Sequence, residues 1–135
     1  MGRKIIGVVF LIVLFAGCGN TVLRDGVYTG KSGEDDTGAW GEVTITITDA
    51  KVQNCEFVTW EKDGTVKDEN YGKINDEISN QAYYDMAQLA VRAMKKYVTD
   101  YLRKGSLKDV EAVSGATISY NQFLEAAEQA LENAK

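Results

Sequence analysis

The chain has 135 residues, of which 44% are hydrophobic and 26% are charged, the proportions of a globular protein with a single core. Its 20 acidic and 15 basic residues give a net charge of −5, which disfavours nucleic acid as a partner. The sequence contains no histidine, which excludes Ser-His-Asp and Cys-His catalysis and any zinc or haem site that depends on histidine.

The first residues have the pattern of a secretory signal. Two basic residues precede an apolar run at 5–16, which is too short for a membrane span because a spanning helix needs about 20 residues. Small residues at 16 and 17 lie directly before Cys18. This resembles the bacterial lipobox, in which the cysteine receives diacylglycerol and the chain is cut before it. We therefore predict a signal peptide at 1–17 and a lipidated Cys18 at the mature N-terminus.

Two other interpretations of this segment stay open. A plain signal peptide could be cut near Gly17 without lipidation, and residues 10–17 resemble hydrophobic octapeptide pheromones released from some Gram-positive lipoprotein signals. Loss of 1–17 removes Arg3 and Lys4 and leaves a net charge of −7. Acyl chains rather than surface charge would then hold the protein to the membrane.

The mature chain is predicted to contain a tether at 18–25 and one domain at 26–135. The domain opens with a glycine-rich loop around a short strand at 27–29. The acidic stretch at 33–38 could suggest calcium, but it lacks the EF-hand spacing of oxygen ligands, which favours a solvated loop.

An antiparallel hairpin follows. Val43, Ile45 and Ile47 alternate with threonines, a period of two that predicts a strand. A tight turn at 49–51 and a returning strand at 52–60 complete the hairpin.

The hairpin strand at 52–60 contains Cys55, which would be the only free thiol of the mature chain because Cys18 would carry lipid. Its apolar neighbours predict a buried structural thiol, with a reactive or intermolecular cysteine as the alternative. The polar segment at 61–73 contains Asp63-Gly64 and is predicted to be a loop with a possible short strand at 65–67.

The second half of the chain has helical periodicity. One long amphipathic helix is predicted from Asn80 to Lys104 and is ended by Gly105. Its apolar stripe, predicted to face the core, consists of Tyr83, Ala87, Ala90, Met94, Tyr97 and Tyr101.

A second, shorter helix is predicted at 120–133. Ser119 and Gln122 fit a capping box at its start. Its apolar face would carry Phe123, Leu124, Ala127 and Leu131. Because strands come first and helices later, the predicted class is α+β, with a small antiparallel sheet packed against one long and one shorter helix.

The segment between the helices, Val113-Ser114-Gly115-Ala116-Thr117, has the features of an anion site. A helix entrance offers unpaired N–H groups and the positive end of the helix dipole. Gly115 allows close approach to the backbone, and Ser114 and Thr117 supply hydroxyls. Many helix entrances of this kind bind nothing, so these features alone leave the question open.

The same residues resemble the flavinylation motif of the bacterial FMN-binding domain, in which Asp and two other residues precede Ser/Thr-Gly-Ala-Thr. The resemblance extends to the opening "DGVYTG", the strand pair and the closing "FLEAAEQAL". It covers most of the mature chain, which looks closest to small lipoproteins of the membrane-immunogen type. It implies that a flavin transferase uses FAD and Mg²⁺ to attach FMN, through its phosphate, to Thr117.

Two positions depart from the family pattern. Glu111 stands where the family has aspartate, which moves the carboxylate by one methylene and could slow the modification. Tyr120 stands where many members have serine. By the resemblance, cofactor binding would involve Glu111 and the turn from Ser114 to Thr117.

The resemblance implies an exported flavoprotein that relays electrons between membrane redox partners at the outer face of the cytoplasmic membrane. We see no catalytic acid, base or nucleophile set in the sequence, which favours a carrier over a stand-alone enzyme. Tyr28, Trp40, Trp60 and Tyr71 could stack on the flavin, although structural packing explains each ring as well. The alternative function is a surface binding module or antigen that kept the fold without the flavin.

Overall fold

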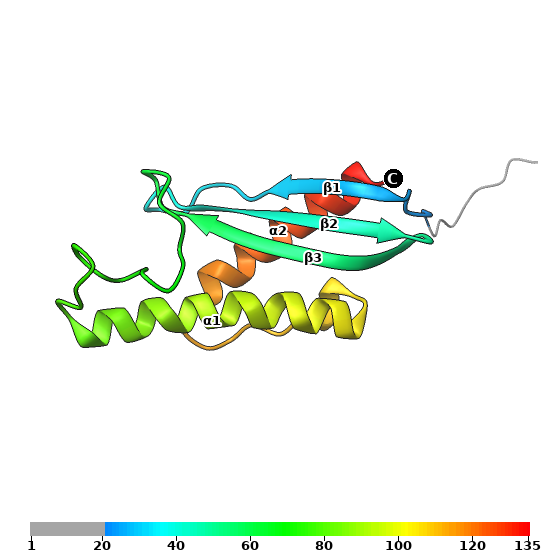
Figure 1. Cartoon of the computed structure of the whole chain (residues 1–135). Helices are drawn as coiled ribbons and strands as arrows, with labels where there is room; N and C mark the ends of the chain where they lie inside the picture. Colours follow the sequence, from blue (N-terminus) through cyan, green and yellow to red (C-terminus); the bar gives the residue numbers. More distant parts are fainter. Residues whose placement is uncertain (1–20) are drawn as a thin grey trace, which may run out of the picture.

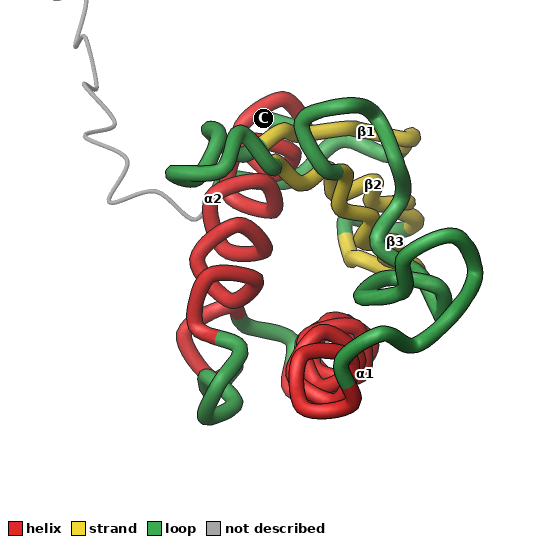
Figure 2. The backbone as a smooth tube through the Cα atoms, turned by 90° about the vertical axis from the view of Figure 1, so that its left-hand side faces the viewer, coloured by secondary structure: helices red, strands yellow, loops and turns green. Residues whose placement is uncertain are grey.

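The computed structural model describes residues 21–135, so the predicted signal peptide and Cys18 lie outside the described residues. Its three antiparallel strands, in the order β1-β2-β3, are covered on one face by two helices (Figures 1 and 2). α2 packs against β1 and β2, and α1 lies along β3. The elements are β1 (Gly26–Lys31), β2 (Trp40–Thr48), β3 (Lys51–Trp60), α1 (Gln81–Lys104), the 3-10 helix η1 (Leu107–Asp109) and α2 (Thr117–Asn133). The α+β class is confirmed.

The β2–β3 hairpin forms as its alternation predicts. Val43, Ile45 and Ile47 are buried, whereas the threonines between them lie on the outer face. The strands are joined by Asp49 and Ala50, which have φ angles of 53° and 61°. Two positive φ angles in a two-residue connection are the geometry of a type I′ turn, whose twist matches that of the strands.

The ends of α1 are those predicted. The Asn80 side chain accepts a hydrogen bond from the Tyr83 N–H at 3.0 Å and caps the helix. At the other end, Gly105 has a φ of 76° and donates its N–H to the Tyr101 carbonyl at 2.8 Å. The stripe was wrong at Tyr83, which is 51% exposed, and Ala90 is only half-buried. Figure 1 shows the reason: the first part of α1 projects beyond the end of the sheet.

The start of α2 was also predicted wrongly. The helix begins at Thr117, with Ala116 as its N-cap, and has no side-chain cap. Ser119 and Gln122 are therefore buried inside the helix rather than forming a capping box. The Gln122 amide instead donates to the Ala39 carbonyl at 3.1 Å and ties α2 to the loop before β2.

The core lies between the sheet and the two helices. Phe123 is fully buried and packs against Phe57, with 5.2 Å between ring centroids. The rest of the buried face of α2 is made mostly of alanines, and the predicted Leu124 and Leu131 are only partly buried. Because these alanine side chains are small, the α2 backbone can lie close to β1.

The segment between β3 and α1 is a loop, as predicted. Instead of a strand at 65–67, it forms two isolated bridges, between Trp60 and Val66 and between Ile74 and Glu77. The Gln88 side chain of α1 donates to the carbonyls of Asp68 and Tyr71, at 3.0 and 2.9 Å, and holds the loop against the helix.

Candidate functional site

The predicted site residues at 114–117 form one tight turn that leads into α2. The Ala116 N–H donates to the Val113 carbonyl at 3.0 Å, and Gly115 has a φ of 84°. A Cβ atom at Gly115 would lie 2.9 Å from Cδ2 of Leu89 on α1. The left-handed backbone therefore favours glycine at this position, whereas the Leu89 side chain could move to admit a Cβ atom.

The Tyr97 side chain, which projects from α1, binds this turn through its hydroxyl. Its hydroxyl accepts the Val113 N–H at 3.0 Å and donates to the Ala116 carbonyl at 3.0 Å. The side chain is fully buried, and burial raises the pKa of the phenol, which keeps it protonated as a donor. A second hydroxyl, that of Tyr120, donates to the Val110 carbonyl at 3.0 Å and fixes the approach to the turn.

Sequence reasoning placed Tyr97 only in the apolar stripe of α1 and missed its contact with the turn. A signal was present, because a buried tyrosine usually needs a partner for its hydroxyl, whereas phenylalanine would satisfy the core alone. The partner could not be named from sequence, because it lies 16 and 19 residues away on a loop.

Thr117 is the first residue of α2, and its side chain is exposed. The first backbone hydrogen bond of the helix runs from the Tyr120 N–H to the Ala116 carbonyl, at 3.1 Å. The preceding N–H groups, of Thr117, Ile118 and Ser119, have no acceptor within residues 21–135. These donors and the helix dipole create a positive potential beside the Thr117 hydroxyl, which suits an anionic phosphate group.

The other predicted site residues have different environments. Ser114 is exposed in the turn, whereas Ala116 is 3% exposed and part of the core. Glu111 is also exposed, and within the described chain its carboxylate takes part in no hydrogen bond or ion pair. The structure thus brings the four motif residues into one turn, whereas Glu111 lies in the irregular segment before it.

Comparison with known sequences identifies the family. The sequence model of the FMN-binding domain family matches residues 38–132, which include β2, β3, α1, the turn and most of α2. The chain belongs to the FMN-binding domain family. No curated protein matches its sequence.

Two solved structures resemble this FMN-binding domain. The crystal structure of the CPE2226 protein from Clostridium perfringens is 25% identical, with a TM-score of 0.64, and the match covers 83% of this chain and 88% of that one. A solution NMR structure of a protein from Clostridium thermocellum is 26% identical, with a TM-score of 0.48, over 84% of this chain and 93% of that one.

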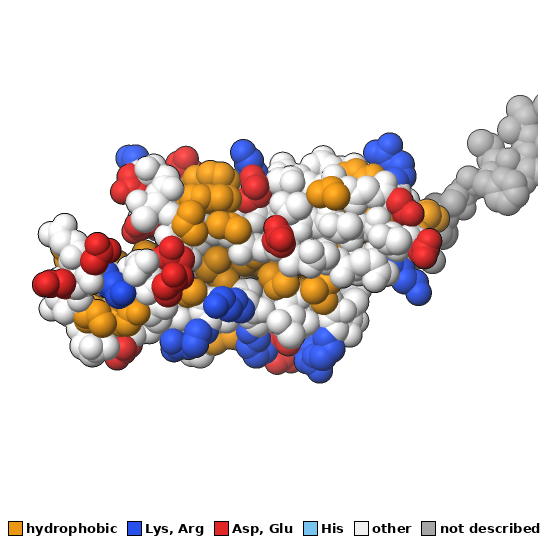
Figure 3. All heavy atoms as spheres, viewed as in Figure 1, with side chains coloured by type: hydrophobic (Ala, Val, Ile, Leu, Met, Phe, Trp, Pro, Cys, Tyr) orange, Lys and Arg blue, Asp and Glu red, His pale blue; other side chains and the backbone are white. Residues whose placement is uncertain are grey.

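The aromatic rings proposed as flavin contacts all have partners within the FMN-binding domain. Trp40 and Trp60 face each other across β2 and β3 and stack with 4.4 Å between ring centroids. Lys31 lies 5.1 Å from the Trp40 ring, and Lys67 lies 4.9 Å from the Tyr71 ring. Figure 3 shows hydrophobic side chains gathered on the outer face of the sheet where β2 begins and β3 ends.

The fourth proposed ring, that of Tyr28, is tied down by its hydroxyl, which donates to the Asp25 carbonyl at 3.2 Å. Tyr28 lies on β1 and packs against the edge of the core. Packing within the chain therefore accounts for all four rings.

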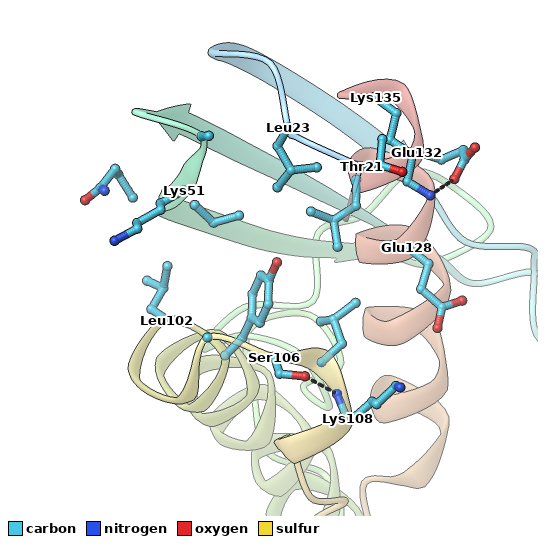
Figure 4. Close-up of a pocket in the computed structure, with 16 residues that line it drawn as sticks. Thr21, Leu23, Lys51, Leu102, Ser106, Lys108, Glu128, Glu132 and Lys135 are labelled. Carbon is cyan, nitrogen blue, oxygen red and sulfur yellow. Dashed lines mark hydrogen bonds and ion pairs between the residues drawn. The ribbon is translucent and has the colours of Figure 1, made fainter. Parts of the chain in front are cut away.

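A cavity of about 960 Å³ in the FMN-binding domain lies at the other end of α2 from the turn. It is lined by Thr21 and Leu23, by the β2–β3 turn and by the ends of both helices, and the ion pair of Lys135 with Glu132 lies on one side (Figure 4). A second cavity, of about 580 Å³, lies between β3 and α1. Neither is lined by residues 114–117, so Thr117 lies on open surface.

The acidic loop of the FMN-binding domain has a structural role. The Asp35 carboxylate accepts hydrogen bonds from the N–H and hydroxyl of Thr37, at 2.8 and 2.6 Å, and from the Ala39 N–H at 3.0 Å. Desolvation raises the pKa of Asp35, but these hydrogen bonds outweigh it and the pKa is lowered. Within residues 21–135, no three His, Cys, Asp or Glu side chains come together as metal ligands would.

Cys55 is a free, buried thiol, as predicted. Burial, with a contribution from Glu56, raises its pKa from 9.0 to about 12, and burial raises the pKa of the neighbouring Tyr101 to about 12 as well. Only the thiolate is nucleophilic, so we expect the native protein to resist iodoacetamide at pH 8, whereas the denatured protein reacts fully.

The same pKa shift predicts alkaline destabilisation. The folded state keeps protons on Cys55 and Tyr101 that the unfolded state loses, so this stabilisation is complete below about pH 9 and declines as the pH rises toward 12. Chemical denaturation as a function of pH, with Cys55→Ala as the control, measures how much of this alkaline loss of stability is due to Cys55. An alkaline decline of equal size in Cys55→Ala would contradict it.

Proposed function

We propose that this FMN-binding domain carries FMN covalently on Thr117 and relays electrons at the outer face of the cytoplasmic membrane. Membership of the family supports the flavin. The observation that carries the site is the exposed Thr117 hydroxyl, which lies in the family motif at the uncapped start of α2. No helix within residues 21–135 has the length and hydrophobicity to cross a membrane.

The attachment would be a phosphoryl transfer from FAD, catalysed by a separate flavin transferase with Mg²⁺. Oγ of Thr117 attacks the phosphorus on the FMN side of the pyrophosphate and forms a phosphoester bond. The bond from that phosphorus to the bridging oxygen breaks, and AMP leaves with the bridging oxygen. The hydroxyl proton passes to a base of the transferase, so no oxidant or reductant is needed.

The residues of the turn fit the phosphate of FMN. The N–H groups of Thr117 and Ile118 would donate to its oxygens. Ser114, exposed beside them, offers a further hydroxyl donor. When bound, the isoalloxazine ring supplies one- and two-electron redox chemistry.

A carrier role is favoured over turnover of a small substrate. The carboxylate nearest to the turn in sequence, Glu111, is exposed and is held by no partner in residues 21–135. General acid or base catalysis needs a group that is positioned and whose pKa is tuned by its surroundings. A tethered electron carrier requires neither.

The direct test is co-expression of the protein with a flavin transferase, followed by intact mass measurement. We expect a mass increase of one FMN less one water, and peptide fragmentation should place it at Thr117. An unmodified mass under conditions that label a known substrate of the transferase would favour the alternative, a surface binding module that kept the fold without the flavin.

We further propose that a diacylated Cys18 anchors the mature protein to the membrane. Cys18→Ala should release the protein into the soluble fraction or leave the precursor uncut, because the acyl chains are the proposed anchor. Fractionation and N-terminal mass measurement check this. If Cys18→Ala is cut and retained in the membrane like the wild type, the anchor is of another kind.

A further inference from the structure

The hydroxyl of Tyr97 connects both ends of the turn that presents Thr117. The Val113 N–H donates to it, and it donates to the Ala116 carbonyl, both at 3.0 Å. Within the turn, the Val113 carbonyl accepts the Ala116 N–H at 3.0 Å. Two connections therefore join Val113 to Ala116: the hydrogen bond between their backbones, and the pair of hydrogen bonds through the Tyr97 hydroxyl.

The Ala116 carbonyl has a second acceptor role. It also receives the Tyr120 N–H at 3.1 Å, which is the first backbone hydrogen bond of α2. One carbonyl thus joins the turn, the first turn of α2 and the Tyr97 hydroxyl. Since Thr117 is the next residue, a shift of this carbonyl changes where the Thr117 side chain points.

Tyr97 is itself held rigidly. Its side chain is fully buried, and its ring packs against Tyr120 and Phe123, with centroid separations of 5.5 and 6.0 Å. Phenylalanine would fill the same space in this core. The turn is the only partner of the Tyr97 hydroxyl within residues 21–135, and buried hydroxyls without partners are costly.

We propose that Tyr97 is a positioning residue for flavin attachment, a role that rests on the proposed function of Thr117. Its hydroxyl holds the Ser114-Gly115 turn in the one conformation that aims the Thr117 hydroxyl at the pyrophosphate of FAD. The contact of Gly115 with Leu89 supports the turn from the same helix, about 12 Å nearer than Tyr97 to the start of α1.

The test compares Tyr97→Phe with Tyr101→Phe. Tyr101 lies one turn later on the same buried face, and its hydroxyl makes no hydrogen bond to residues 21–135, so this control removes the same atom without touching the turn. Labelling by the transferase is measured as kcat and KM at a temperature at which circular dichroism shows both variants to be folded. Hydrogen exchange at the Val113 amide is measured in parallel.

We expect Tyr97→Phe to exchange the Val113 amide about tenfold faster or more and to be labelled at least about tenfold more slowly, chiefly through kcat, because a misplaced nucleophile loses its attack geometry. Tyr101→Phe should match the wild type in both measurements. If Tyr97→Phe does not fold, Val113→Pro removes the N–H donor while it leaves the Tyr97 ring in place, and it should also slow labelling.

Equal labelling of wild type and a folded Tyr97→Phe would overturn the role of Tyr97 and leave the proposed function standing. Equal slowing of Tyr97→Phe and Tyr101→Phe would show a general effect on the core and would also overturn it. An unlabelled wild type would overturn the proposed function, and the role of Tyr97 with it.

Discussion

Thr117→Val is expected to abolish covalent flavin attachment while the protein stays folded. Valine has nearly the shape of threonine but no hydroxyl, so the attacking oxygen is removed. The side chain is exposed at the first position of α2, where the change costs little stability. In-gel flavin fluorescence and intact mass measure the attachment, and the melting temperature reports the fold.

Neighbouring substitutions separate the acceptor from its surroundings. Ser114→Ala should only weaken labelling, because Ser114 supports the phosphate without forming the bond. Glu111→Asp should maintain or raise the yield, since it restores the residue of the family pattern. A flavin found on another residue of the wild type would contradict the assignment to Thr117. Labelling of Glu111→Asp without labelling of the wild type would show that this chain has lost the modification.

Gly30→Val is expected to have the largest effect on folding. Gly30 lies in β1 and faces α2, where an added Cβ atom would collide with the carbonyl oxygen of Ala126 and the backbone nitrogen of Ala130. Both are backbone atoms of a helix and cannot move aside alone. We expect a loss of at least about 3 kcal/mol, the upper end of the usual cost of overpacking, with failure to fold as the extreme.

Two side chains of α2 also hold the helix close to β1, because they form hydrogen bonds with the backbone on either side of Gly30. Gln129 accepts the Lys31 N–H, and Asn133 donates to the Thr29 carbonyl at 2.9 Å. Gly33→Ala is the matched control, because a Cβ atom there meets only the flexible Glu125 carboxylate at 3.4 Å. Urea denaturation of both variants measures the difference. A loss below about 1 kcal/mol in Gly30→Val would mean that α2 can shift away from the sheet.

Local signals account for the parts of the fold that sequence predicted well. The hairpin followed from strict alternation, and α1 from its periodicity together with Asn80 and Gly105 at its ends. These signals act over a few residues, so the sequence alone contains them. The burial of Tyr83 was predicted wrongly because a helical stripe does not tell how far the sheet beneath it extends.

The start of α2 shows where local reasoning failed. Ser119 and Gln122 have the spacing of a capping box, but Gln122 is used for a long-range hydrogen bond to Ala39, which is 83 residues away. The helix could begin earlier because Tyr97 and the left-handed Gly115 fix the turn without a side-chain cap. The motif at 114–117 was visible in sequence, whereas the residues that support it were separated from it along the chain.

The two ends of α2 have different neighbours. The Arg24 N–H donates to the Ala134 carbonyl at 2.8 Å, so the chain enters the domain beside the last residues of α2. Thr117 begins the same helix, whose 17 residues rise about 25 Å along the axis. In a protein anchored at Cys18, the three residues from there to Thr21 add at most about 11 Å of reach. The length of α2 and this short tether would then limit how far Thr117 can lie from the bilayer, and its redox partners would have to reach it within that distance.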